Sequence, residues 1–113
     1  MFPKKNRITK TGFDELLKKG QVFHSPYFSL RCLKKNDTVP KFAFVVSKKV
    51  AKNAVDRNVL RRRGYSALRE IGILKEKNKW IGFSVAFFFK KEAKNLGFKE
   101  TEKGIEELLR KVS

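Results

Sequence analysis

Basic side chains crowd one stretch of the sequence, from Ser47 to Glu70. Eight lysines and arginines fall between Lys48 and Arg69, against one acidic residue, Asp56. Ammonium and guanidinium groups donate hydrogen bonds to phosphate oxygens, and the planar fork of arginine also matches base edges. The plain alternative is a solvated helix surface, but such surfaces intersperse charges of opposite sign, whereas here like charges are crowded at a cost. The stretch therefore predicts binding to a polyanion.

Local signals place these charges on a helix between Asn53 and Gly72. Asn53 is suited to the N-cap, Asp56 complements the helix dipole, and Gly72 is suited to a left-handed stop. Helical spacing separates an apolar face, predicted to pack on the core, from a neighbouring polar face. The apolar face consists of Leu60, Gly64, Ala67, Leu68 and Ile71, and the polar face of Asn58, Arg61, Arg62, Tyr65 and Arg69.

Composition supports a folded basic module. The 113 residues carry 28 Lys and Arg against 11 Asp and Glu, a formal net charge of +17. Such a field attracts nucleic acid or an anionic membrane. Hydrophobic residues make up 41% of the chain, including 11 Phe, which is too apolar for a disordered basic tail. We expect a single domain spanning residues 1–113, with residues 1–10 as an extended basic arm.

Groups that could perform catalysis are sparse. The chain has one histidine, His24, and one cysteine, Cys32, which excludes a disulfide within the chain and favours a reducing compartment. No metal-ligand spacing, phosphate loop or nucleophile motif occurs, and the carboxylates are dispersed. The N-terminus lacks the apolar segment of a signal peptide, and no apolar run is long enough to span a bilayer. We predict a cytoplasmic protein with no membrane partner. Its role is to bind a polyanion, and any chemical step is carried out by another molecule.

The remaining elements follow from periodicity. A short helix is expected from an N-cap at Thr11 to Gly20, with Phe13, Leu16 and Leu17 facing inward. Alternating patterns predict strands at 27–34 and 41–47, joined as an antiparallel hairpin, with Phe28 on the buried side of the first. Residues 80–89 form the most apolar run and predict a central strand covered on both faces. A final amphipathic helix spans 99–112, with Phe98, Ile105, Leu108, Leu109 and Val112 on its apolar side.

The predicted order is therefore α-β-β-α-β-α. The strand-helix-strand unit at 41–89 makes its two strands parallel. We predict an α/β (α+β) two-layer sandwich with a mixed sheet and a βαβ crossover.

The stretch SKKVAKNAVDRNVLRRRGYSALRE resembles the protein subunit of bacterial ribonuclease P. In that family a strand ending in Ser-Lys-Lys leads into a helix with an Arg-Asn-Arg motif followed by basic residues. The likeness extends to the positions of Phe13, Leu17, Gly20, Phe28 and Leu30, and to the closing strand and helix. The sequence departs from the family pattern at three places: Val59 replaces the second arginine of Arg-Asn-Arg, Gly64 interrupts the basic helix, and Arg31 replaces a frequent aromatic.

The resemblance implies a holoenzyme in which a large RNA carries the active site and its Mg²⁺ ions and removes the 5′ leader of precursor tRNA. The expected partners are this RNA and precursor tRNA, with no obligate protein partner, no cofactor held by the protein and no catalytic residue in it. The family also implies a left-handed crossover, whereas sequence alone would have predicted a right-handed one.

Two sets of residues are predicted to contact RNA. The RNA-binding set is Lys48, Lys49, Lys52, Arg57, Asn58, Arg61, Arg62, Arg63, Tyr65 and Arg69. The set lining a cleft for the leader is Phe13, Leu17, Ser29, Arg31 and Lys48. Arg57 lies at the border of the apolar helix face, so it could either brace the core edge or reach the cleft.

Two other functions remain to be distinguished. A non-enzymatic RNA-binding module, such as a ribosome-associated protein, would share the basic helix but needs no leader cleft. A membrane-surface protein is disfavoured, because the basic helix lacks the wide apolar face that such helices use.

Overall fold

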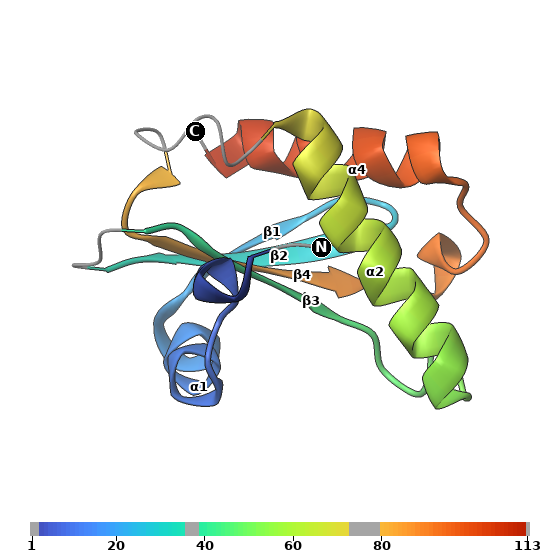
Figure 1. Ribbon diagram of the computed structural model, residues 1–113, viewed down its shortest axis with the longest axis horizontal. Helices are drawn as coiled ribbons and strands as arrows, with labels where there is room; N and C mark the ends of the chain where they lie inside the picture. The colour runs from blue at the N-terminus through green and yellow to red at the C-terminus, as the bar shows by residue number, and fades with distance from the viewer. Residues whose placement is uncertain (1–2, 36–38, 73–79, 113) are drawn as a thin grey trace.

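The computed structural model describes residues 3–35, 39–72 and 80–112 (Figure 1). The charged connection predicted at 75–79, and most of the turn predicted after residue 34, lie outside the described residues. Four strands form one sheet: β1 (Gln21–His24), β2 (Phe28–Lys34), β3 (Lys41–Val45) and β4 (Phe83–Phe89). The α-helices are α1 (Lys10–Lys19), α2 (Ala54–Ile71) and α4 (Phe98–Val112), and η1 (Lys4–Asn6) and η3 (Lys91–Ala93) are short 3₁₀ helices.

The sheet has the order β1-β2-β4-β3. The α+β class and the parallel pairing of β3 with β4 are confirmed. The predicted hairpin between β2 and β3 is wrong, because β4 lies between them and pairs antiparallel with β2. β4 takes this central place because it is apolar on both faces and gains most from being covered on both sides.

Strand β1 is absent from the predicted order, which becomes α-β-β-β-α-β-α. Its four residues are mostly exposed, so it lacks the alternation that identifies a half-buried strand. The strand exists because the chain turns back on β2, where the backbone N–H and the hydroxyl of Ser25 both donate to the Phe28 carbonyl. Hairpin pairing with β2, rather than an alternating pattern of its own, produces this edge strand.

Helices cover both faces of the sheet (Figure 1). α2 and α4 pack against each other on one face, above the aromatic core. α1 lies on the opposite face, where the Phe13 ring meets the Phe88 ring with centroids 6.0 Å apart. The predicted two layers, the sheet and the α2–α4 layer, are present. α1 adds a further helix that covers part of the opposite face of the sheet.

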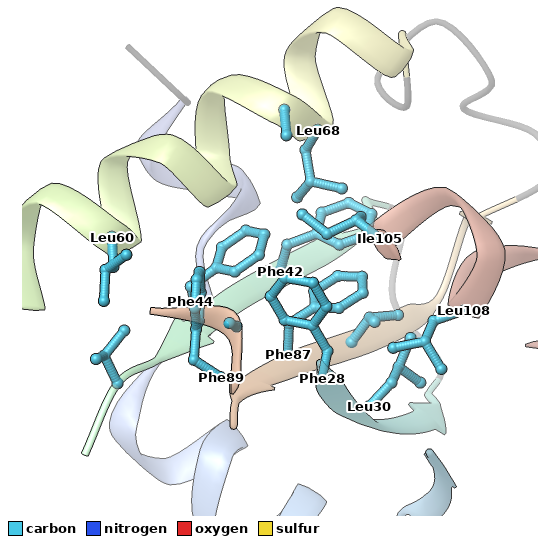
Figure 2. Close-up of a cluster of buried hydrophobic side chains, with 14 of the residues drawn as sticks. Phe28, Leu30, Phe42, Phe44, Leu60, Leu68, Phe87, Phe89, Ile105 and Leu108 are labelled. Carbon is cyan, nitrogen blue, oxygen red and sulfur yellow. The ribbon is translucent and has the colours of Figure 1, made fainter. Parts of the chain in front are cut away.

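The core lies between the sheet and the α2–α4 layer (Figure 2). The predicted inward faces of β2 and β3 are confirmed, and their side chains meet those of the two helices. Buried residues of this cluster include Phe28, Leu30, Cys32, Phe42, Phe44, Leu60, Leu68, Phe87, Phe89, Ile105 and Leu108. Leu17 and Phe98 were expected to face inward but are 39% exposed each.

The segment before α1 is docked rather than wholly extended. Residues 1–2 lie outside the described residues, but Asn6 Nδ2 donates to the Pro40 carbonyl, and the Ile8 N–H donates to the Phe42 carbonyl. The N-cap of α1 is Thr9, not the predicted Thr11, and its hydroxyl accepts from the Gly12 N–H. The helix begins early because the chain is already fixed against β3 at this point.

α2 keeps its predicted limits and ends at Gly72 with a φ of 79°. Asn53 is the N-cap by position, but its side chain makes no capping hydrogen bond. The interrupting Gly64 has a structural reason, since a Cβ atom there would lie 2.5 Å from Phe44 Cδ1. The glycine thus lets the helix backbone approach the sheet closely.

Candidate nucleic-acid interface

The predicted polar face of α2 forms one wall of a hollow of about 580 Å³. All five predicted residues of that face line it: Asn58, Arg61, Arg62, Tyr65 and Arg69. Ser66 and Arg7 complete the lining, and sequence reasoning missed both. We call this surface the arginine hollow. Among the described residues that line it, four of seven are arginines and none is acidic, so the hollow offers a concentrated positive potential to a polyanion.

Tyr65 lines the arginine hollow and also packs against the core. Its ring meets Phe44 edge-on, with centroids 4.9 Å apart, and the Arg7 guanidinium lies 5.2 Å from its centroid. Burial raises the pKa of the Tyr65 phenol, so the group stays neutral at physiological pH. Tyr65 thus joins the core to the basic surface, and Arg7 covers part of the ring that sequence reasoning assigned to RNA.

Two arginines of the predicted RNA-binding set hold backbone instead. Arg57 Nη1 donates to the carbonyls of Ala51 and Lys52, at 3.0 and 2.7 Å. Arg63 Nη1 donates to the Leu96 carbonyl at 2.9 Å, so it ties α2 to the connection before α4. Of the two roles left open for Arg57, bracing is the one that the contacts favour. Neither residue lines the arginine hollow.

The predicted lysines lie on the connection between β3 and α2. Lys48, Lys49 and Lys52 are exposed, and their connection is the one that Arg57 braces. Their side chains form no hydrogen bond or ion pair with the rest of the described chain. They extend the basic surface beyond the N-terminal end of α2.

The predicted leader residues gather on the other face of the sheet, around Phe88. The Arg31 guanidinium lies 5.9 Å from the Phe88 ring centroid, and Arg31 Nη1 donates to the Leu17 carbonyl at 2.9 Å. Ser29 is the direct partner of Phe88 across β2 and β4. We call Phe13, Arg31 and Phe88 the Phe88 cluster. It joins residues from three elements, α1, β2 and β4.

Phe88 itself was assigned to the core by sequence reasoning, and it is half-buried on the opposite face from Phe87 and Phe89. Strand alternation could have separated it from its neighbours. Lys48 lies after β3 on the connection to α2 and forms no hydrogen bond, ion pair or ring contact with the cluster among the described residues. The structure thus brings four of the five predicted leader residues, Phe13, Leu17, Ser29 and Arg31, to the Phe88 cluster.

The described part of the chain contains no cluster of side chains suited to binding a metal ion. Its His, Cys, Asp and Glu residues form no group of three or more that could hold an ion. The Cys32 thiol is buried, which raises its pKa. Among the described residues, no helix is long and apolar enough to cross a bilayer.

The family model described as Ribonuclease P matches residues 2–113, nearly the whole chain. This chain belongs to the ribonuclease P protein family. Its relatives include the ribonuclease P protein component of a Nitratiruptor species, 48% identical over 54 residues that cover 48% of this chain and 47% of the relative. The same component from a Pseudanabaena species is 36% identical over 73 residues, or 63% of each chain. The alignments thus span about half to two thirds of these relatives.

Solved structures share the fold. The ribonuclease P protein of Staphylococcus aureus superposes with a TM-score of 0.77 and 22% identity, covering 96% of this chain and 95% of that one. The protein from Thermotoga maritima gives a TM-score of 0.80 at 20% identity, covering 95% and 97%. The arrangement of helices and sheet is therefore common to the family.

The departure at Val59 lies away from the arginine hollow. Val59 is 44% exposed and lines a second, smaller hollow of about 200 Å³ together with Arg63 and Lys94. The valine therefore removes a cation from the flank of α2, while the arginines of the polar face stay together.

Proposed function

We propose that this chain is the protein subunit of ribonuclease P, which binds the catalytic RNA subunit and the 5′ leader of precursor tRNA and assists endonucleolytic removal of that leader. The observation that carries the proposal is the arginine hollow on α2, in a chain that belongs to the ribonuclease P protein family. Four arginines converge there, and the part of the chain that the structure describes places no carboxylate in the lining to neutralise them. The precursor tRNA substrate and the free Cys32 favour action in the cytoplasm.

The arginine hollow and the lysines before α2 form the proposed surface for the RNA subunit. Lys48, Lys49 and Lys52 are exposed point charges, whereas Arg61, Arg62 and Arg69 offer planar forks that can engage two phosphate oxygens at once. Arg57 and Arg63 act in this surface by holding the backbone around it.

The Phe88 cluster forms the proposed leader site, with Leu17 and Ser29 beside it. Single-stranded RNA is bound by stacking its bases on aromatic rings and on guanidinium planes. Phe13, Phe88 and Arg31 supply both kinds of surface within one cluster. Arg31, at a position where the family often has an aromatic residue, keeps a planar group there.

Chemistry in this proposal belongs to the RNA. Mg²⁺ at the RNA active site would supply the Lewis acid and the activated water for phosphodiester hydrolysis. The protein binds, positions the leader and neutralises phosphate charge, and none of its residues touches the reacting atoms.

Reconstitution tests the proposal. The protein, added to the ribonuclease P RNA of the same organism at low Mg²⁺ concentration, should restore cleavage of precursor tRNA at the mature 5′ end. A triple variant, Arg61→Gln with Arg62→Gln and Arg69→Gln, should bind the RNA poorly and fail to restore it, while keeping the circular dichroism of the folded protein. Absence of cleavage with the unmodified protein would contradict the proposal and leave a non-enzymatic RNA-binding module as the function.

A further inference from the structure

The N-terminal segment contributes a residue to the arginine hollow that neither the basic stretch nor the family motif includes. Arg7 lies between η1 and α1, about fifty residues before the arginines of α2. It nevertheless lines the hollow together with Arg61, Arg62 and Arg69. Two distant parts of the chain therefore build one cationic surface.

The backbone around Arg7 is held firmly in this place. Arg7 forms a parallel bridge with Phe42 at the outer edge of β3, and the Ile8 N–H donates to the Phe42 carbonyl at 3.1 Å. On the other side of Arg7, the buried Asn6 side chain donates to the Pro40 carbonyl at 2.8 Å. Arg7 is thus presented to α2 by ordered backbone rather than by a free arm.

The side chain of Arg7 is not satisfied by the described part of the protein. Its guanidinium carbon lies 5.2 Å from the Tyr65 ring centroid, no carboxylate lines the hollow around it, and its buried Nε has no hydrogen-bond acceptor among the described residues. A buried donor without a partner is costly. Gathering four guanidinium groups around one hollow adds repulsion to that cost. An anion seated in the hollow would relieve the repulsion.

We propose that Arg7 is an RNA-binding residue, and that it and the arginines of α2 together hold a phosphate of the RNA subunit's backbone. A phosphate group matches the bidentate geometry of guanidinium forks, and four arginines from two parts of the chain line the hollow. Binding there ties the Arg7 side chain to α2 and opposes local opening of the segment that carries it. This inference rests on the proposed function for the identity of its RNA.

Paired charge-removing variants test the inference. Arg7→Gln and Lys5→Gln each remove one positive charge from the same segment, but Lys5 is exposed and does not line the hollow. Binding of each variant to ribonuclease P RNA is measured over a series of salt concentrations. Arg7→Gln should weaken binding by about tenfold to a hundredfold, whereas Lys5→Gln should change affinity by less than about threefold. Arg7→Gln should also lower the salt slope, which is the steepness of the fall of log affinity with log salt concentration, by about one. Arg7→Lys should recover part of the affinity and all of the slope.

Amide hydrogen exchange at Ile8 separates a phosphate contact from a merely structural role. The Ile8 N–H is already bonded to the Phe42 carbonyl, so it exchanges by local opening, and RNA bound through Arg7 should oppose that opening in the unmodified protein more than in Arg7→Gln. Equal affinities and slopes for Arg7→Gln and Lys5→Gln would overturn the inference, as would a loss of affinity with no change in slope. If Arg7→Gln behaves as expected but the unmodified protein restores no cleavage, the phosphate contact stands and the proposed function fails.

Discussion

Individual arginines of α2 have different roles, although they look alike in the sequence. Arg62 is exposed and lines the arginine hollow, while Arg57 is half-buried and holds two backbone carbonyls. Charge-assisted hydrogen bonds to partly buried carbonyls contribute to stability, whereas an exposed charge contributes to binding. Substitution of Arg57 should therefore change mainly the stability of the protein, and substitution of Arg62 mainly its affinity for RNA.

Arg57→Gln is expected to lower the free energy of unfolding by about 1–2 kcal/mol, because two carbonyls lose their donor. Arg62→Gln should change it by less than about 0.5 kcal/mol and should lower the salt slope of RNA binding by about one. Urea unfolding and RNA titration of both variants check this. Equal stabilities for the two variants would contradict the bracing role of Arg57.

Gly64 is a residue at which packing overrides helix propensity. Alanine would gain about 1 kcal/mol of propensity in the helix interior. Its Cβ, however, would lie 2.5 Å from the ring of Phe44, which is itself stacked on Phe87 with centroids 5.0 Å apart. Overpacking of this kind costs about 1–3 kcal/mol and can exceed the gain.

Gly64→Ala is therefore expected to destabilise the protein by about 1–2 kcal/mol in urea unfolding. Val55→Ala is the matched control, since Val55 is on the same helix and 71% exposed, and it should change stability by less than about 0.5 kcal/mol. An unchanged or higher midpoint for Gly64→Ala would show that Phe44 can shift.

Elements, rather than single residues, create the proposed leader site. α1 brings Phe13 over β4, and β2 brings Arg31 beside it, so the Phe88 cluster exists only where these three elements meet. The hydrogen bond from Arg31 to the Leu17 carbonyl fixes α1 at this place. Disturbing the cluster should affect the leader and leave the mature tRNA body unaffected.

Phe13→Ala and Arg31→Ala are each expected to lower the affinity of the reconstituted holoenzyme for precursor tRNA by about tenfold, the value of one lost stacking contact. Affinity for mature tRNA, which lacks a leader, should stay within about twofold. Phe98→Ala, an exposed aromatic on α4 and therefore on the opposite face of the sheet from α1, is the control. Equal losses for precursor and mature tRNA would contradict a leader site here.

The whole molecule combines one apolar core with an uneven distribution of charge. The net charge of +17 is concentrated on α2 and the segments beside it, whereas α4 carries acidic and basic residues together, such as the pair Glu106 and Arg110. α4 therefore serves as a scaffold for α2, and the positive electrostatic potential that attracts RNA is strongest on the α2 side of the protein.

RNA affinity should consequently depend steeply on salt. With six to ten phosphate contacts, the double-helical DNA reference gives a loss of about a thousandfold or more between about 50 and 200 mM salt. Filter binding of ribonuclease P RNA across this range measures it. A flat dependence would contradict a binding surface made of phosphate contacts.

The sequence by itself determined the local features. Periodicity identified α2, its core face and its polar face, because side chains at helical spacing share a side whatever lies around them. Alternation likewise identified the inward residues of β2 and β3, and the basic stretch identified the family. The left-handed crossover stays a prediction from that family.

Only the tertiary structure decided which distant segments meet. It inserted β4 between β2 and β3, added β1 to the edge of the sheet, and placed α1 on the second face. It also brought Arg7 to the hollow on α2 and turned Arg57 and Arg63 onto backbone carbonyls. The insertion of β4, the position of α1, and the contacts of Arg7 and Arg63 depend on the burial and hydrogen bonding of residues far apart in the chain, which no local pattern records. The β1–β2 hairpin and the Arg57 contacts join residues near in the chain, but they too depend on how the backbone turns and not on side-chain periodicity.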